Sequence, residues 1–257
     1  MSVSGTNFGN AAADYRKFRA GFPESIFERL SDFGIGRRAQ RIIDLGTGTG
    51  TLARGFARRG CDVVGIDPDV RMLEQAAQLD AEIGVQITYV EGTAEATGLD
   101  DGIADAVSAG QCWHWFDRPR ALMEVERLLM PRGKLVIAHF DWLPLPGNVV
   151  SATEELIMQY NPDWHLGGGN GQYPQWLPDL KESGMKGIQT FSYDLDVPYT
   201  PEAWIGRIRA SAGVAVLDSE AGKGFDDDLT RVLAEGFPVD LLAVPHRVFA
   251  IVCEKRN

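Results

Sequence analysis

The feature that most constrains this chain is a glycine-rich turn between an apolar segment and an amphipathic one. The apolar segment, Arg41–Leu45, has the length and residue types of a short buried strand. Glycines at 46, 48 and 50 then allow a sharp turn without steric cost. Residues 51–59 carry apolar side chains at helical spacing and end at Gly60. A strand, a tight turn and a helix in this order predict the first half of a βαβ unit, with a ligand held against the turn.

Apolar, strand-like runs alternate with helical patterns along the rest of the first half. We expect strands at 41–45, 62–66, 86–90, 104–109 and 134–140, with helices between most of them. In the second half we expect strands at 188–197 and 248–253 and helices at 151–160, 201–210 and 226–235. The alternation predicts an α/β fold with a mostly parallel sheet and helices on both faces.

The charge of the chain limits its partners. Its 257 residues carry a formal charge of −11, which disfavours binding to nucleic acid or to an anionic membrane. The balance is uneven, with +5 on residues 1–60 and −16 on the remainder. The three cysteines have no metal-ligand spacing, and neither a signal peptide nor a long apolar run is visible. We therefore expect a cytoplasmic protein with a small-molecule partner, as a monomer or a homodimer.

The spacing within the turn separates two classes of ligand. A dinucleotide fingerprint reads G-x-G-x-x-G, whereas this turn reads G-x-G-x-G. The strand before it carries Asp44, which would oppose a pyrophosphate but suits an ammonium or sulfonium group. The next strand ends at Asp67, and an acid at that place can accept hydrogen bonds from both hydroxyls of a ribose. Pro68 and Met72 follow, and the methionine side chain can cover a flat adenine.

Four segments together resemble the class I S-adenosylmethionine-dependent methyltransferases. They read IIDLGTGTG, VVGIDPDVRML, EGTAEAT and ADAVSAGQCWHWFD. They are most similar to the small-molecule group related to ubiquinone and trans-aconitate methyltransferases. The resemblance extends over residues 8–141 and implies a Rossmann-like sheet of seven strands, the last one antiparallel.

The resemblance also implies which residues bind the cofactor, S-adenosylmethionine. The turn would hold its methionine and ribose portions, Asp67 the ribose hydroxyls, and residues further along the chain the adenine edge and the methyl donor. Where family members often have aspartate this chain has Thr93, and Glu95 is the substitute we expect. The full set expected from the sequence is Asp44, Gly46, Thr47, Gly48, Gly50, Asp67, Pro68, Met72, Thr93, Ala94, Glu95, Gly110 and Gln111.

Family members often carry an N-terminal helix over the cofactor. Here Tyr15 and Arg19 stand at i and i+4 and would share a helix face. We expect Arg19 to pair with the cofactor carboxylate and Tyr15 to cover the site. The alternative is an amphipathic surface helix with a solvated arginine.

Aromatic residues gather after the fourth expected strand. His114 lies among them and is the candidate catalytic base, needed only if the acceptor must lose a proton. An aromatic-walled acceptor pocket is expected from Trp113, Trp115, His139 and Trp142. Ordinary core and lid packing would explain the same pattern. No carboxylates cluster at the strand ends concerned, so we expect no metal.

We expect one methyltransferase domain over residues 1–257. Residues 1–35 form a helical cover, 36–141 the cofactor-binding core, 142–185 an inserted cap and 186–257 the rest of the sheet. The predicted reaction is methyl transfer from S-adenosylmethionine to oxygen, nitrogen or carbon of a small aromatic or carboxylate-bearing metabolite. The alternatives are a nicotinamide-dependent oxidoreductase and a methyltransferase-like subunit that binds the cofactor without catalysis. A nucleic-acid methyltransferase is disfavoured by charge and by the lack of an Asn/Asp-Pro-Pro-Tyr motif.

Overall fold

A computed structural model describes residues 21–256. The chain divides into two compact units. The core unit comprises residues 21–140, 173–193 and 248–256, and the helical unit comprises residues 141–172 and 194–247. Three long strands pass from one unit into the other, so the units are not consecutive stretches of sequence.

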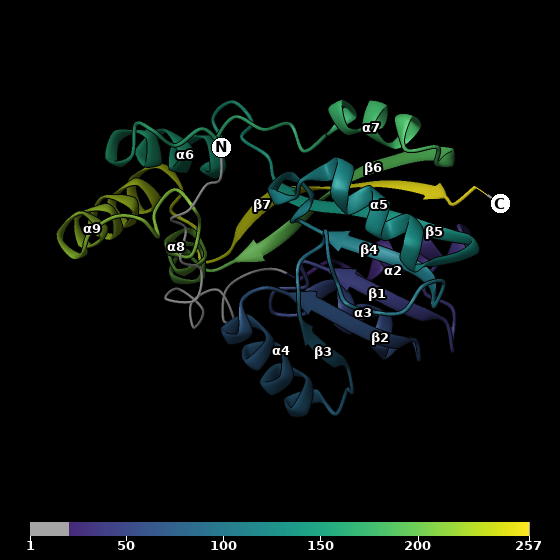
Figure 1. Cartoon of the computed structure of the whole chain (residues 1–257). Helices are drawn as coiled ribbons and strands as arrows, with labels where there is room; N and C mark the ends of the chain where they lie inside the picture. The colour runs from purple at the N-terminus through teal and green to yellow at the C-terminus, as the bar shows by residue number, and fades with distance from the viewer. Residues whose placement is uncertain (1–20, 257) are drawn as a thin grey trace. The chain divides into compact units, whose positions relative to one another are not determined.

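The sheet has seven strands in the order β3-β2-β1-β4-β5-β7-β6. The pairs β1–β2, β1–β4, β2–β3 and β4–β5 are parallel. The strand β7 runs against β5, since Leu143 pairs with Pro245 and Lys255 with Gly133, and Figure 1 shows its arrow opposed to that of β6. The expected seven-stranded sheet with an antiparallel last strand is confirmed. The strands are β1 (Arg41–Leu45), β2 (Asp62–Asp67), β3 (Thr88–Glu91), β4 (Ala104–Gly110), β5 (Leu129–Trp142), β6 (Lys186–Tyr199) and β7 (Leu242–Glu254).

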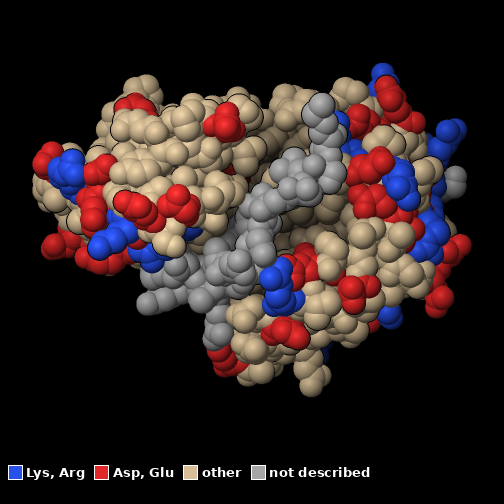
Figure 2. All heavy atoms as spheres, turned by 60° about the vertical axis from the view of Figure 1, so that its left-hand side comes forward, with Lys and Arg blue, Asp and Glu red and all other residues tan. Residues whose placement is uncertain are grey.

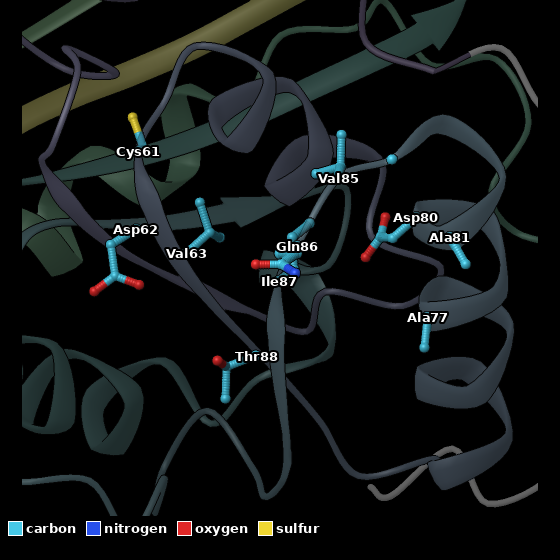
Figure 3. Close-up of a pocket in the computed structure, with 11 residues that line it drawn as sticks. Cys61, Asp62, Val63, Ala77, Asp80, Ala81, Val85, Gln86, Ile87 and Thr88 are labelled. Carbon is cyan, nitrogen blue, oxygen red and sulfur yellow. The ribbon is translucent and has the colours of Figure 1, made fainter.

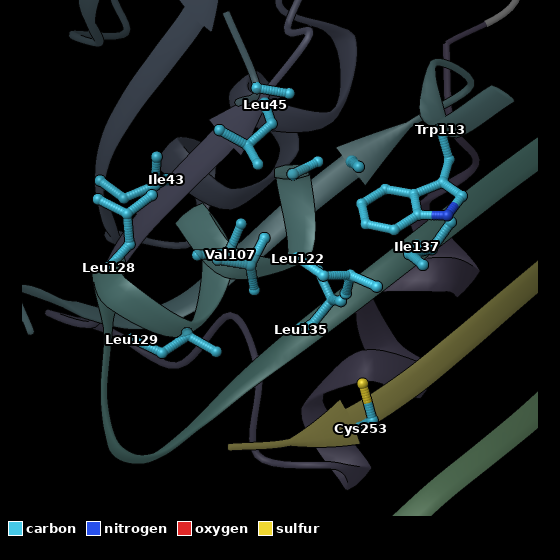
Figure 4. Close-up of a cluster of buried hydrophobic side chains, with 14 of the residues drawn as sticks. Ile43, Leu45, Val107, Trp113, Leu122, Leu128, Leu129, Leu135, Ile137 and Cys253 are labelled. Carbon is cyan, nitrogen blue, oxygen red and sulfur yellow. The ribbon is translucent and has the colours of Figure 1, made fainter. Parts of the chain in front are cut away.

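The central strands are apolar because both of their faces are buried. Ile43 of β1 pairs with Val64 of β2 and with Val107 of β4, and none of the three is more than 3% exposed. Such strands read as continuous apolar runs, as parallel strands covered on both faces do. Leu122, Leu128 and Leu135 join this cluster from neighbouring elements, as Figure 4 shows.

Two helices of the core unit begin at an aspartate that caps them. Asp69 accepts from the Arg71 amide and caps α4, and Asp117 accepts from the Arg120 amide and caps α5. Aspartate is among the residues preferred at helix N-caps, so both helix starts agree with the residue types in the sequence. The helices of this unit are α2 (Glu24–Asp32), α3 (Thr51–Arg58), α4 (Val70–Ile83), α5 (Arg118–Leu128) and α7 (Leu177–Glu182), with short 3-10 turns η2 (Trp113–Trp115) and η3 (Pro174–Trp176).

The helical unit has an apolar centre of its own. Its helices are α6 (Val149–Tyr160), α8 (Pro201–Arg209) and α9 (Ser219–Gly236). Trp204 of α8 and Phe225 of α9 are fully buried there, together with Ile157 of α6. The cap expected over 142–185 differs from this unit in two respects. Residues 173–193 pack with the core unit, and residues 194–247, expected with the rest of the sheet, belong to the helical unit.

Charged side chains of both signs occur together in several places on the face shown in Figure 2, with wide uncharged areas between them. The described residues on this face form no continuous basic patch. Among residues 21–256, no helix has the length and apolar character required to span a membrane.

Candidate functional site

The glycine-rich turn joins β1 to α3 through three left-handed backbone positions. Gly46, Gly48 and Gly50 have φ angles of +60°, +55° and +77°. A Cβ at Gly46 would lie 2.9 Å from the Cys112 side chain, and one at Gly50 would lie 2.5 Å from the Tyr89 hydroxyl. Only glycine avoids both the backbone strain and these collisions. The turn therefore presents bare backbone at the carboxyl end of β1, where open α/β sheets bind ligands.

Asp44 lies beneath this turn. Its carboxylate is 1% exposed, and its two oxygens accept from the Thr47 hydroxyl at 2.7 Å and the Ser108 hydroxyl at 2.6 Å. Burial raises the pKa of Asp44 to about 6, although the two hydroxyls act in the opposite direction. The structure thus gives Asp44 a supporting position that ties the turn to β4, rather than an exposed position against a ligand.

Asp67 connects the turn to the next strand. One of its oxygens accepts from the Gly48 amide at 2.8 Å and the other from the Asp69 amide at 2.9 Å. A carboxylate can accept about four hydrogen bonds, so these two leave capacity for two hydroxyl donors. The side chain is half-buried, and burial raises its pKa. This geometry fits a ribose with its two hydroxyls turned toward β2.

Met72 packs against the turn from α4. Its Cε lies 3.6 Å from the position that a Cβ of Gly48 would occupy, and the side chain is mostly buried. Pro68 is exposed at the start of the loop before α4. These positions place an apolar side chain beside the bare backbone of Gly48, which suits the expected contact with a flat ring.

A buried ion pair lies behind the turn, and no sequence pattern indicates it. Arg54 of α3 pairs with Asp80 of α4 at 2.7 Å and donates to the Thr49 carbonyl at 2.9 Å. The hydroxyl of Tyr89 on β3 donates to the other oxygen of Asp80 at 2.8 Å. Burial raises the pKa of Tyr89, and this bond raises it further. The three side chains join α3, α4 and β3 to the back of the turn. Asp80 and Tyr89 lie 26 and 35 residues after Arg54, so no local sequence pattern indicates that the three side chains meet.

The loop after β3 carries the residues expected at the adenine edge. Thr93 forms an isolated bridge with Ala96 and is exposed, whereas Ala94 is buried in the core cluster. Glu95 accepts from the Asp117 amide at 2.9 Å, which ties this loop to the start of α5. Glu95 is the residue expected to replace the aspartate of family members, and one of its oxygens therefore already accepts a hydrogen bond within the chain.

The end of β4 has an unusual backbone. Gln111 adopts a φ of +58°, which is uncommon for a residue with a side chain and is concentrated at functional positions. Its amide donates to the Ala138 carbonyl at 2.8 Å, and its side chain bonds to the Phe140 carbonyl. A Cβ at neighbouring Gly110 would lie 3.0 Å from the Phe22 ring. The expected methyl-donor segment is thus held firmly between β4 and β5.

The aromatic run after β4 separates into buried and exposed members. Trp113 is 0% exposed and packs edge-on against Phe116 in the apolar cluster labelled in Figure 4. Its expected contact with the substrate is therefore corrected to a role in the core. Trp115 is 44% exposed and its ring lies 4.6 Å from that of His114, which is also exposed. His114 and Trp115 are thus the exposed members of this run.

His139 lies in an aromatic stack whose other members the sequence did not indicate. It is 1% exposed, and its ring centre lies 4.2 Å from that of Tyr173 and 5.7 Å from that of His114. Tyr173 stacks on Trp176 at 4.3 Å with the rings nearly parallel. These two aromatic residues come from a segment expected to be a cap, 34 and 37 residues after His139. The stack places two histidines beside each other near the end of β5.

The remaining expected residues lie elsewhere. Trp142 belongs to the helical unit, where its indole nitrogen donates to Glu154 at 2.8 Å. Tyr15 and Arg19 lie outside the described residues, and their expected role stays a prediction. Among residues 21–256, no group of three or more histidine, cysteine, aspartate or glutamate side chains is arranged to hold a metal.

A separate cavity of about 760 Å³ lies at the amino ends of β2 and β3, whereas the glycine-rich turn lies at the carboxyl end of the neighbouring strand β1. Figure 3 shows residues from the start of β2, the end of α4 and the start of β3 around it, including Asp62, Ala81 and Thr88. Because parallel strands bind ligands at their carboxyl ends, this amino-end cavity is not the expected cofactor site.

Comparison with known proteins agrees with the geometry of the turn. Residues 43–137 match the model of a methyltransferase domain. The chain is 40% identical over 135 residues to an uncharacterised methyltransferase of Mycobacterium tuberculosis, covering 52% of this chain and 51% of that protein. It is 36% identical over 161 residues to the demethylmenaquinone methyltransferase of Thermus thermophilus, covering 60% of this chain and 72% of that protein. The chain thus spans about half the length of the first of these relatives.

Solved structures share the fold at lower identity. One is the phosphoethanolamine N-methyltransferase 2 of Haemonchus contortus in complex with S-adenosyl-L-methionine. It superposes with a TM-score of 0.59 at 19% identity, covering 100% of this chain and 59% of that one. The YcgJ protein of Bacillus subtilis gives a TM-score of 0.59 at 18% identity, covering 91% and 100%. The turn built on Gly46–Gly50 and Asp67 agrees with the matched domain and with the similarity to the Thermus enzyme. This chain therefore belongs to the class I S-adenosylmethionine-dependent methyltransferases.

Proposed function

We propose that this protein transfers a methyl group from S-adenosylmethionine to an oxygen, nitrogen or carbon atom of a small organic molecule. The observation that carries the proposal is the pair of hydrogen bonds that the Gly48 and Asp69 amides donate to the Asp67 carboxylate. They fix a carboxylate with remaining acceptor capacity beside a turn of bare backbone. The bound cofactor would supply an activated methyl group on a sulfonium centre.

The residues of the turn fit this cofactor better than a dinucleotide. Asp44 is buried beneath the turn, two residues before Gly46, so its carboxylate disfavours a pyrophosphate there, which needs positive or neutral surroundings. The Asp67 carboxylate suits a ribose, and Met72 offers an apolar surface beside Gly48. The alternative of a nicotinamide-dependent oxidoreductase predicts binding of a pyrophosphate at the same turn.

Methyl transfer mainly requires alignment and exclusion of water, so few side chains need to take part in bond changes. His114 is the residue we propose to accept a proton from the acceptor where one must be removed, since it is exposed and lies beside Trp115 and His139. The relatives named above include enzymes that act on demethylmenaquinone and on phosphoethanolamine, so small acceptors of different chemistry occur among similar proteins. The cytoplasmic location expected from the sequence stays a prediction.

The proposal is tested with S-adenosylmethionine carrying an isotope-labelled methyl group. The whole chain is incubated with it and with metabolite extracts, and the small-molecule, protein and nucleic-acid fractions are counted separately. Label in the small-molecule fraction is the expected result. Label confined to nucleic acid or protein would overturn the small-molecule assignment, and cofactor binding without any transfer would favour a non-catalytic subunit.

A further inference from the structure

One ion pair of the core unit lies directly against the glycine-rich turn. The Nε of Arg54, on the first part of α3, donates to Asp80 at 2.7 Å, and the two side chains are only 14% and 4% exposed. An Nη group of the same guanidinium donates to the Thr49 carbonyl at 2.9 Å and to the Ala76 carbonyl at 3.3 Å. A single side chain therefore binds α4 on one side and the backbone of the turn on the other.

Asp80 and Tyr89 hold the guanidinium in one position. Figure 3 shows the Asp80 side chain on the side of α4 that faces the sheet, and its second oxygen accepts from the Tyr89 hydroxyl at 2.8 Å. A Cβ at Gly50 would lie 2.5 Å from that hydroxyl and 3.2 Å from an Nη of Arg54. The network thus fills the space directly behind Gly50, where only a glycine fits.

The bond from Arg54 reaches a peptide group that has little else to fix it. The Thr49 carbonyl and the Gly50 amide belong to the same peptide plane, and the amide donates to the Thr47 carbonyl at 2.8 Å. Gly50 has a φ of +77°, but glycine adopts other backbone angles just as readily. Bare backbone therefore does not hold this orientation by itself, and Arg54 supplies the second attachment of the plane.

The turn is consequently held from two directions. Asp67 binds the Gly48 amide at 2.8 Å, and Arg54 binds the next carbonyl along the chain, that of Thr49. A buried ion pair adds little net stability, because desolvation offsets its attraction, so its effect is better sought in the orientation of what it holds. A ligand binds a mobile loop more weakly in proportion to the fraction of molecules in the competent conformation.

We propose that Arg54 is a positioning residue for the cofactor, and that Asp80 and Tyr89 act through it. Arg54 holds the Thr49–Gly50 peptide plane in the orientation that accepts S-adenosylmethionine and does not itself contact the cofactor. This inference rests on the proposed function, because it assigns a role at the same turn. All the residues that carry it belong to the core unit.

The first test compares affinities for S-adenosylhomocysteine by calorimetry, on the whole chain and at a temperature where every variant is folded. Arg54→Met keeps the apolar stem and removes the donors, and it should raise the Kd by about 3- to 30-fold. Arg59→Met is the control. Arg59 follows the same helix, pairs with Glu24 and lies 4.9 Å from the centre of the Phe27 ring, at the end of α3 remote from the turn. Its Kd should stay within about twofold of the wild type, and an equally small change in Arg54→Met would overturn the proposal.

The second test observes the turn without the cofactor. A tenfold rise in Kd requires that the competent orientation fall to about one tenth of the molecules. In a chain carrying isotope-labelled glycine, the NMR signal of the free Gly50 amide should therefore shift or broaden in Arg54→Met and return to the wild-type position with S-adenosylhomocysteine bound. Arg59→Met should leave it unchanged. A merely structural role lowers the free energy of unfolding without moving this signal, so a raised Kd with an unchanged Gly50 signal would also refute the proposal.

Two more variants separate charge from geometry. Arg54→Lys keeps the charge beside Asp80 but lacks the planar set of donors, so its Kd should lie above that of the wild type and no higher than that of Arg54→Met. Wild-type affinity in Arg54→Lys would show that charge alone suffices and that the bond to Thr49 is not needed. If Arg54→Met folds poorly because Asp80 has lost its cation, Arg54→Met/Asp80→Asn removes both charges and keeps an acceptor for Tyr89. The same criteria then apply to the double variant.

The wild-type affinity distinguishes failure of this inference from failure of the proposed function. If the wild-type chain binds S-adenosylhomocysteine and Arg54→Met binds it equally well, the positioning role is refuted and the cofactor assignment stands. If the wild-type chain does not bind S-adenosylhomocysteine, the proposed function fails and the positioning role fails with it.

Discussion

Replacement of Asp67 by alanine probes the turn most selectively. The substitution removes the acceptors of two backbone amides, those of Gly48 and Asp69, at 2.8 and 2.9 Å. Hydrogen bonds to a charged group contribute about 1.5–3 kcal/mol each, and water replaces part of that at a half-buried position. We expect the free energy of unfolding to fall by about 1.5–3 kcal/mol in total. Loss of the two ribose contacts should raise the Kd for S-adenosylhomocysteine by about 5- to 150-fold, which corresponds to ~1–3 kcal/mol.

The neighbouring Asp69 supplies the matched control. Its side chain caps α4 by accepting from the Arg71 amide, so Asp69→Ala should lower the free energy of unfolding by about 0.5–2 kcal/mol. Asp69 is not expected to contact the cofactor, so the Kd of Asp69→Ala for S-adenosylhomocysteine should stay within about twofold of the wild type. Chemical denaturation gives the stabilities and isothermal titration calorimetry the affinities. If Asp67→Ala loses stability but binds S-adenosylhomocysteine as the wild type does, then Asp67 does not hold the ribose.

Two further substitutions test the support of the turn and the proposed base. The pKa of Asp44 is about 6 in the folded state, above its unfolded value of about 4. The protonated carboxyl therefore stabilises the fold, and up to ~3 kcal/mol of this contribution is lost as the pH rises from 4 through 6. Denaturation of wild type and Asp44→Asn across this range should show a stability difference that changes with pH, and a constant difference would refute the shifted pKa. His114→Ala should lower turnover, once an acceptor is known, while leaving the S-adenosylhomocysteine Kd within about twofold, whereas the exposed His165→Ala should change neither. Unchanged turnover in His114→Ala would return this histidine to a structural role.

The sequence predicts the local parts of this fold well because their causes are local. A buried strand, three glycines and an amphipathic helix specify the turn, and Asp69 and Asp117 mark the starts of α4 and α5. The end of β2 at Asp67 follows from an apolar run closed by an acid. Each of these signals lies within about ten residues, where periodicity and capping rules apply.

Contacts between distant segments could not be predicted in the same way. Trp113 lies in a run of aromatic residues that suggests a pocket, but the apolar cluster around β4 and α5 buries it completely. Tyr173 and Trp176 stack near His139 only because residues 173–193 pack with the core unit. The Arg207 guanidinium stacks on the Trp142 ring, a contact between residues 65 apart that no local sequence pattern indicates.

Binding of S-adenosylmethionine at the turn built on Gly46–Gly50 and Asp67 can be measured by calorimetric titration of the whole chain with S-adenosylhomocysteine and, separately, with NADH. We predict saturable binding of S-adenosylhomocysteine that Asp67→Ala weakens, and no binding of NADH. Binding of NADH without binding of S-adenosylhomocysteine would contradict the account and favour a nicotinamide-dependent enzyme.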